Sequence, residues 1–340
     1  MSISESPSSP TAVTIEPTEN TRSTSIRSTF KAQSTIESLS SIITNVPDSS
    51  NLAFSLLHDP EIASQLSSLL RQQDAGAGND NLCRWLYDTF QSTEPQLQLV
   101  VLRYLPLLAG VYLSRVTIRK PLAGFEAVLL ALYAHETTSR SSQSVTMNVP
   151  DLSHPSIYHE SKTTVKSSDE TDLNIVVISP ILEPHGTVRS TKRERIVGVA
   201  LELYYSKISQ LPVASKIDFC EFCEAWAGDR EDTVNNNGNQ NEESLERERR
   251  RIPLSWELVQ PILKILCHCL LGPDQAQQKN KQLFDAASSA CNSLYGRSLR
   301  DINPKVMLAT RNLLILAKLS LESQNEIDYT EIRMTDVISL

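Results

Sequence analysis

The sequence predicts a mostly α-helical protein: a multi-helix orthogonal or solenoid-like bundle, with a small two-stranded β element and a disordered N-terminal leader. Beyond residue 50, apolar residues recur every three or four positions in most segments, which is the period of a helix with one buried face. Only ten of the 340 residues are glycine and 6% are aromatic, a composition that suits helices better than a many-stranded sheet. Because 40% of the residues are hydrophobic, the chain is able to bury a sizeable core.

Changes in composition divide the chain into three parts. Residues 1–48 are rich in serine and threonine and too poor in apolar residues to offset the entropy of ordering, so they are predicted to be a disordered leader. A helical domain is expected over residues 49–322, interrupted by a disordered asparagine-rich and charged insert at about residues 229–248. Residues 323–340 are expected to form a loose C-terminal tail.

The N-terminal half of the domain is predicted to contain four helices. The first begins at Pro60, where Asp59 provides an N-cap. The second covers Leu82–Phe90 and follows a glycine-containing loop. The third runs over Pro95–Val116 and is apolar enough to raise the alternative of a membrane span. Because Arg103 and Pro106 interrupt its middle, a buried, proline-kinked helix is the favoured interpretation.

The fourth helix is expected within Lys120–Glu136 and carries a glycine in its interior. Gly124 costs about 1 kcal/mol relative to alanine there, so a close approach by another segment must compensate, with Phe125 beside it on the apolar stripe. The small residues Ala109 and Gly110 favour the preceding helix as the neighbour, and a helix of a partner protein is the alternative. These positions are predicted to mediate helix packing.

The centre of the chain changes periodicity and then returns to helices. The segments SVTMNVP (144–150) and LNIVVISP (173–180) predict two short strands flanking a long surface loop. Helices are expected from about Arg193 and over Val213–Trp226. Three more are expected over 255–272, 281–296 and 304–323, each ended by a glycine or a polar break.

Cysteines and histidines provide the only candidates for site chemistry. Cys220 and Cys223 in CEFC, with Cys267 and Cys269 in CHC, offer four ligands of the kind that zinc prefers. They lie within apolar helical periods, where cysteine packs as a small hydrophobic residue, so core packing is favoured over a metal site.

No sequence signature of an enzyme is present. A P-loop, a G-x-S-x-G elbow, the kinase motifs and an H-E-x-x-H helix are all missing from the sequence, so the chain is predicted to have no catalytic residues and no cofactor. The pairs His135–Glu136 and His159–Glu160 lack a further partner at a workable spacing. The formal net charge of -8 disfavours nucleic acid as a partner. A basic run at Glu246–Arg251 offers a weak contact with anionic lipid, and a solvated helix start is the alternative.

Four segments in the same order resemble the hyccin family: GFEAVLLALYAHE, VPDLSHPSIYHE, CEFCEAWAG and RIPLSWELVQPILKIL. The resemblance covers Leu52 to Leu319, broken by the asparagine-rich insert. The chain lacks the long C-terminal tail of the animal proteins, which indicates a plant-like member and puts in doubt any contact made by that tail.

The resemblance implies a non-catalytic scaffold or regulatory subunit of a plasma-membrane phosphatidylinositol 4-kinase alpha complex. The implied partners are a tetratricopeptide-repeat scaffold protein, the kinase itself and, indirectly, a lipid-anchored membrane adaptor. The implied location is the cytosol and the cytoplasmic face of the plasma membrane, with membrane contact only through partners. The competing hypotheses are an independent α-helical lipid- or protein-binding adaptor in membrane trafficking and, below it, an enzyme of unrecognised type.

The family-matching loop contains the candidate partner-binding residues Pro155, Tyr158, His159 and Glu160. Two interpretations of Tyr158 remain open: it faces a partner, or it pins the loop to its own core.

Overall fold

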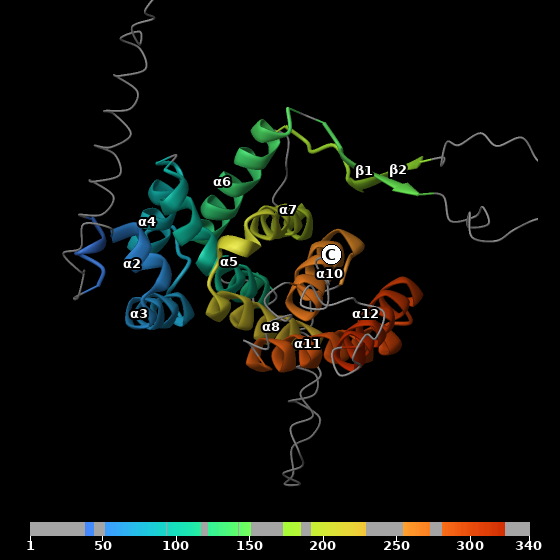
Figure 1. Cartoon of the computed structure of the whole chain (residues 1–340). Helices are drawn as coiled ribbons and strands as arrows, with labels where there is room; N and C mark the ends of the chain where they lie inside the picture. The colour runs from blue at the N-terminus through green and yellow to red at the C-terminus, as the bar shows by residue number, and fades with distance from the viewer. Residues whose placement is uncertain are drawn as a thin grey trace, which may run out of the picture.

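A computed structural model of the chain shows a helical body with one projecting β-hairpin (Figure 1). It describes residues 38–43, 52–92, 94–116, 122–141, 143–150, 173–184, 192–228, 254–272 and 281–323. The N-terminal elements are α2 (Leu52–His58), α3 (Pro60–Arg71), α4 (Asn81–Phe90), α5 (Pro95–Val116) and α6 (Ala123–Ser139). The hairpin consists of β1 (Val145–Pro150) and β2 (Leu173–Ser179). The C-terminal elements are α7 (Arg193–Ser206), η3 (Ile208–Gln210), α8 (Val213–Ala227), α10 (Trp256–Leu271), α11 (Lys281–Arg300) and α12 (Pro304–Ser323). The predicted mostly α-helical fold with a small two-stranded β element is confirmed, whereas most of the leader, the insert at about 229–248 and nearly all of the C-terminal tail lie outside the described residues.

Aspartate side chains start two of the N-terminal helices. One carboxylate oxygen of Asp59 accepts hydrogen bonds from the backbone N–H groups of Glu61 and Ile62 at 2.8 and 3.4 Å, as the sequence predicts. Asp80 caps α4 in the same way, and its second oxygen accepts a bond from the Gly76 N–H at 2.7 Å. Each cap satisfies N–H groups that have no partner within the helix.

Helix α5 is the central helix of the body. Every residue from Leu99 to Leu113 is buried, because α2, α3, α4, α7 and α8 all pack against α5. Among the described residues it is the single helix long and apolar enough to cross a membrane, and 89% of its most apolar window is buried inside the protein. The predicted buried helix is therefore confirmed.

Hydrogen bonds at Arg103 connect α5 with two of the helices that cover it. Arg103 donates to the carbonyl oxygens of Leu56 and Leu57 and so caps the C-terminal end of α2. Pro106 lacks an N–H group, and near it the Ser215 hydroxyl donates to the Arg103 carbonyl at 2.6 Å. These bonds connect α5 with α2 on one side and α8 on the other.

Gly124 lies against the loop between α3 and α4, and not against α5 as the sequence suggested. Its N–H donates to the Gly76 carbonyl at 2.9 Å. A Cβ atom at position 124 would lie 2.5 Å from the Ala77 carbonyl oxygen and 3.0 Å from the Cβ atom of Cys83. Gly76, which has a φ of +89°, in turn leaves room for the buried ring of Phe125. The close approach is therefore intramolecular, between the start of α6 and a tight loop.

The small residue Gly110 serves a different contact. A Cβ atom there would overlap the ring of Phe222, so this glycine lets α8 approach α5. In the C-terminal half, Gly198 likewise lets α7 approach the backbone of α10, because a Cβ atom would lie 2.5 Å from the Glu257 carbonyl oxygen. Gly272 ends α10 as predicted, whereas α11 continues through Gly296 to Arg300 and is longer than predicted.

Two apolar residues of the serine-rich segment before residue 49 are covered by the helical body. Leu39 is fully buried and Ile43 nearly so, and both belong to the main hydrophobic core. Their apolar side chains are covered by the helices although the segment around them is rich in serine.

Candidate partner-binding surfaces

The outer face of α12 carries an apolar stripe that no described residue covers. Val306, Thr310, Leu313 and Ala317 form the buried face against α10 and α11. The opposite face presents four aliphatic side chains whose exposed fractions are 47–56%, namely Leu308, Ile315, Leu316 and Leu319. We call these four residues the α12 stripe. They fall on one side of the helix by their spacing, and α12 lies at the rim of the body (Figure 1).

An apolar outer face is unusual for a helix at the rim of a helical body. A surface helix normally presents a polar face to water, opposite the apolar stripe that faces the core. Arg311 and Lys318, seven residues apart, lie along one border of the α12 stripe by helical geometry. The stripe therefore has the form of a helix-packing surface with a basic border.

The β-hairpin is the second apolar surface. Its strands pair antiparallel, with Met147 opposite Val176 and Asn148 opposite Ile175. Because side chains alternate along a strand, Met147 and Val176 share one face, while Ile175 and Val177 lie on the other. All four are exposed, so the hairpin is apolar on both faces.

The base of the hairpin is fixed to the body by a buried charged network. Arg140, at the end of α6, binds Glu136 at 2.6 Å, Glu202 of α7 at 2.8 Å and the Ser179 hydroxyl at 2.6 Å. Burial by itself lowers the pKa of Arg140, but hydrogen bonds to Glu202 and Glu136 raise it above its ordinary value. Lys264 of α10 adds a further ion pair to Glu202 at 3.6 Å. These contacts hold the base of the hairpin against α6 and α7, and the rest of the hairpin projects from the helical body (Figure 1).

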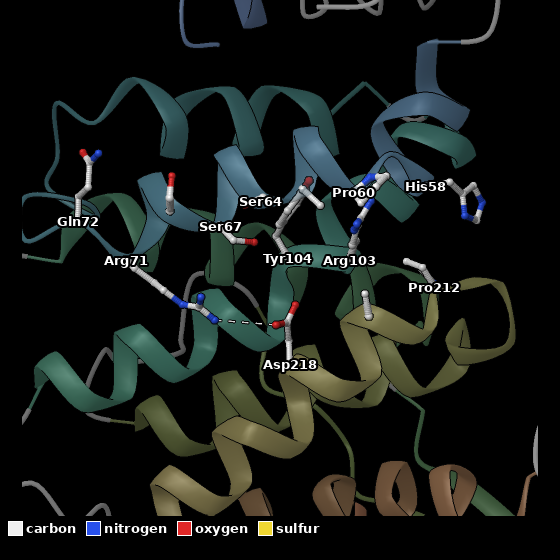
Figure 2. A pocket seen from close by; sticks show the side chains of 13 residues that line it. His58, Pro60, Ser64, Ser67, Arg71, Gln72, Arg103, Tyr104, Pro212 and Asp218 are labelled. Atoms are coloured by element: carbon white, nitrogen blue, oxygen red, sulfur yellow. Dashed lines mark ion pairs between the residues drawn. The ribbon is translucent and has the colours of Figure 1, made fainter. Parts of the chain in front are cut away.

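A groove of about 660 Å³, lined by both polar and apolar side chains, lies between α3 and α8 (Figure 2). Ser64, Ser67 and Arg71 line one wall, and Asp218 lies opposite Arg71 at 3.9 Å. Burial raises the pKa of Asp218, and Arg71 opposes that shift. Tyr104 also lines the groove, and its buried hydroxyl has no hydrogen-bond partner among the described residues. Burial raises the pKa of Tyr104 to about 12.

The groove contains serine, histidine and aspartate but not in a catalytic arrangement. Within the part of the chain that the structure describes, no hydrogen bond links His58 to a lining serine or to Asp218. The His58 ring instead lies against Phe54, with ring centroids 4.4 Å apart. The groove is therefore able to accept polar groups by hydrogen bonding, and its geometry shows no activated nucleophile.

Three of the four cysteines considered as zinc ligands are buried in the core. Cys220, Cys223 and Cys269 pack there, and a hydrogen bond with Cys269, followed by burial, raises the pKa of the Cys220 thiol. Cys267 is exposed, so core packing was the wrong interpretation for this residue. Among the described residues no group of three or more His, Cys, Asp or Glu side chains is placed to hold a metal ion.

The candidate residues from the sequence are only partly placed by the structure. Pro155, Tyr158, His159 and Glu160 lie outside the described residues, as does the basic run 246–251. His135 contacts the Phe90 ring edge-on, with centroids 5.3 Å apart, while the neighbouring Glu136 binds Arg140. Sequence reasoning missed the α12 stripe. The signal available was an excess of leucine and isoleucine on all sides of 304–323, more than one buried face requires.

A helical body with two apolar surfaces, one at a rim helix and one on a projecting hairpin, defines a protein-interaction module. The family model described as Hyccin matches residues 47–336. The chain therefore belongs to the hyccin family, and the resemblance seen in the sequence is confirmed. At the level of the family, this means a non-catalytic subunit associated with a phosphatidylinositol 4-kinase alpha complex.

Proposed function

We propose that this chain is a scaffold or regulatory subunit that supports the assembly, stability and membrane localisation of a phosphatidylinositol 4-kinase complex. In this role it promotes phosphatidylinositol 4-phosphate synthesis without performing the reaction. Its direct partner is a tetratricopeptide-repeat scaffold protein, and a lipid-anchored adaptor brings the assembly to the cytoplasmic face of the plasma membrane. Family membership supports the association with the kinase complex.

The observation that carries the proposal is the α12 stripe. Removing exposed aliphatic side chains from water contributes about 25 cal/mol per Å² of apolar area, so covering the stripe favours association. A scaffold built of helical repeats offers a groove between helices that matches a helical ridge. The basic border formed by Arg311 and Lys318 would be complemented by acidic residues beside that groove.

The test is co-expression of the chain with its repeat scaffold, followed by affinity measurement. The variant Ile315→Lys/Leu319→Lys replaces two half-exposed side chains, so it is expected to leave the fold intact while reducing affinity at least tenfold. The matched control is Phe54→Lys, which adds a lysine at an equally exposed apolar position of α2 and is expected to bind normally.

Two results would contradict the proposal. One is equal affinity of the α12 variant and the wild type for the scaffold. The other is a chain that does not bind the scaffold but binds anionic vesicles without any partner, which would favour the hypothesis of an independent lipid-binding adaptor.

A further inference from the structure

The β-hairpin combines properties that natural proteins usually avoid in an exposed strand pair. Neither strand, VTMNVP nor LNIVVIS, contains a charged residue, and no third strand of the described residues pairs with them. Exposed edges are normally protected by charges, since an unpaired row of N–H and C=O groups invites another strand. A two-stranded sheet alone is marginally stable, and a third strand would stabilise it.

The exposed part of β2 starts where its anchoring ends. Gln260 of α10 donates to the Ile178 carbonyl at 2.7 Å, and Arg140 holds Ser179. All residues of Asn174–Val177 are exposed, and the exposed fraction of Ile175 reaches 71%. The body therefore fixes one end of β2 and presents the remainder to solvent.

We propose that β2 accepts an extended, uncharged, β-branched segment of another protein in the same assembly as a third strand of this sheet. The backbone of the incoming strand would supply the hydrogen bonds, and its alternating side chains would cover Val176 on one face and Ile175 and Val177 on the other. An uncharged segment is required because a charge placed against this surface would lose water without gaining a partner. The inference rests on the proposed function, since that function supplies the assembly.

The small area that one strand edge buries argues against a second copy of the chain as the occupant. A seven-residue strand spans roughly 23 Å, and pairing along one such edge buries well under the roughly 800 Å² per partner of a stable complex. Two free chains joined only by their hairpins would therefore associate weakly. A protein already held elsewhere in the assembly needs only this second, intramolecular contact, which benefits from a high effective concentration.

Composition distinguishes a protein partner from a lipid bilayer. Segments that insert into the membrane interface usually carry tryptophan, tyrosine, lysine or arginine to anchor them at the headgroups. Neither strand contains any of these residue types. The open edge also requires hydrogen-bond partners, which a strand provides and hydrocarbon does not.

The experiment compares backbone hydrogen exchange of the full chain alone and in the assembly reconstituted with the repeat scaffold, the kinase and the lipid-anchored adaptor. We expect exchange in residues 173–179 to slow at least tenfold in the assembly, and omission of one component at a time identifies which one donates the strand. Size-exclusion chromatography first shows whether the assembly forms at all. Its failure to form contradicts the proposed function, whereas an assembly with unprotected β2 amides contradicts only this inference.

A variant gives the independent readout. Val176→Lys/Val177→Lys places a charge on each face and is expected to return exchange over residues 173–179 in the assembly to the rate of the free chain, while binding through the α12 stripe continues. Phe54→Lys again serves as the control for an added surface charge. Slow exchange that persists in the lysine variant overturns the inference. So does a hairpin-dependent dimer of the isolated chain in sedimentation, or hairpin-dependent flotation with uncharged phosphatidylcholine vesicles.

Discussion

Helices α5 and α12 are both long and rich in leucine, yet they occupy opposite environments. α5 has 22 residues and is surrounded by five other helices, so even Arg103 and Pro106 are buried. α12 has 20 residues and, within the described part of the chain, packs chiefly against α10 and α11, which leaves the α12 stripe exposed. The comparison teaches that α12 has the apolar composition of a core helix, but no described element covers its outer face.

The largest expected effect separates the two helices by stability. Leu105→Ala removes a side chain that is 1% exposed in α5, and we expect the free energy of unfolding to fall by about 2–5 kcal/mol. Leu316→Ala removes the same group from a half-exposed position in α12 and should cost less than about 0.5 kcal/mol in the isolated chain. Denaturant titration of both variants measures the difference. Equal losses would mean that α12 is enclosed like α5.

A smaller loss of stability is expected from adding a methyl group at Gly124, where the start of α6 lies against the backbone of the α3–α4 loop. Gly124→Ala introduces a methyl group 2.5 Å from the Ala77 carbonyl oxygen, and overpacking of this kind costs about 1–3 kcal/mol. Gly124 is the second residue of α6, so the gain in helix propensity is smaller than the roughly 1 kcal/mol of a helix interior and offsets only part of that cost.

Gly78→Ala is the matched control for this position. A methyl group there would meet only the Cβ atom of Ala123, at an ordinary 3.6 Å. Thermal unfolding is expected to show a lower midpoint for Gly124→Ala than for Gly78→Ala. A reversed order would rule out the proposed steric cause.

The smallest expected effect on stability comes from the partly buried carboxylate of Asp218 in α8. Burial raises the pKa of Asp218 in the folded chain, so the ionised carboxylate costs stability at neutral pH, and this cost disappears as the pH falls below the pKa of the unfolded chain. Asp218→Asn should therefore raise the unfolding midpoint slightly at pH 7 and leave it unchanged near pH 3. Asp88→Asn, on the exposed face of α4, is expected to change it at neither pH. A midpoint lowered by Asp218→Asn at pH 7 would show that the Arg71 contact dominates instead.

Local sequence signals were sufficient wherever one short segment contains all the interacting atoms. The Asp59 cap, the β-branched run that forms β2 and Gly272 at the end of α10 each depend on a few adjacent residues. The neighbour of Gly124 was predicted wrongly because the choice between α5 and the α3–α4 loop depends on contacts from 48 positions away, at Gly76. The glycine itself signalled a close approach, but a missing side chain carries no information about which segment approaches.

The sequence by itself determined that the chain is mostly helical, that two short strands interrupt the helices and that the chain resembles the hyccin family, because helix caps, periodicity and ordered segment matches are properties of neighbouring residues. Only the tertiary structure decided which helices enclose α5, that the α12 stripe is exposed and that a charged network holds the base of the hairpin while both of its apolar faces are in water. The physical reason is that a periodic pattern shows which side chains are apolar, whereas burial depends on whether another element arrives to cover them.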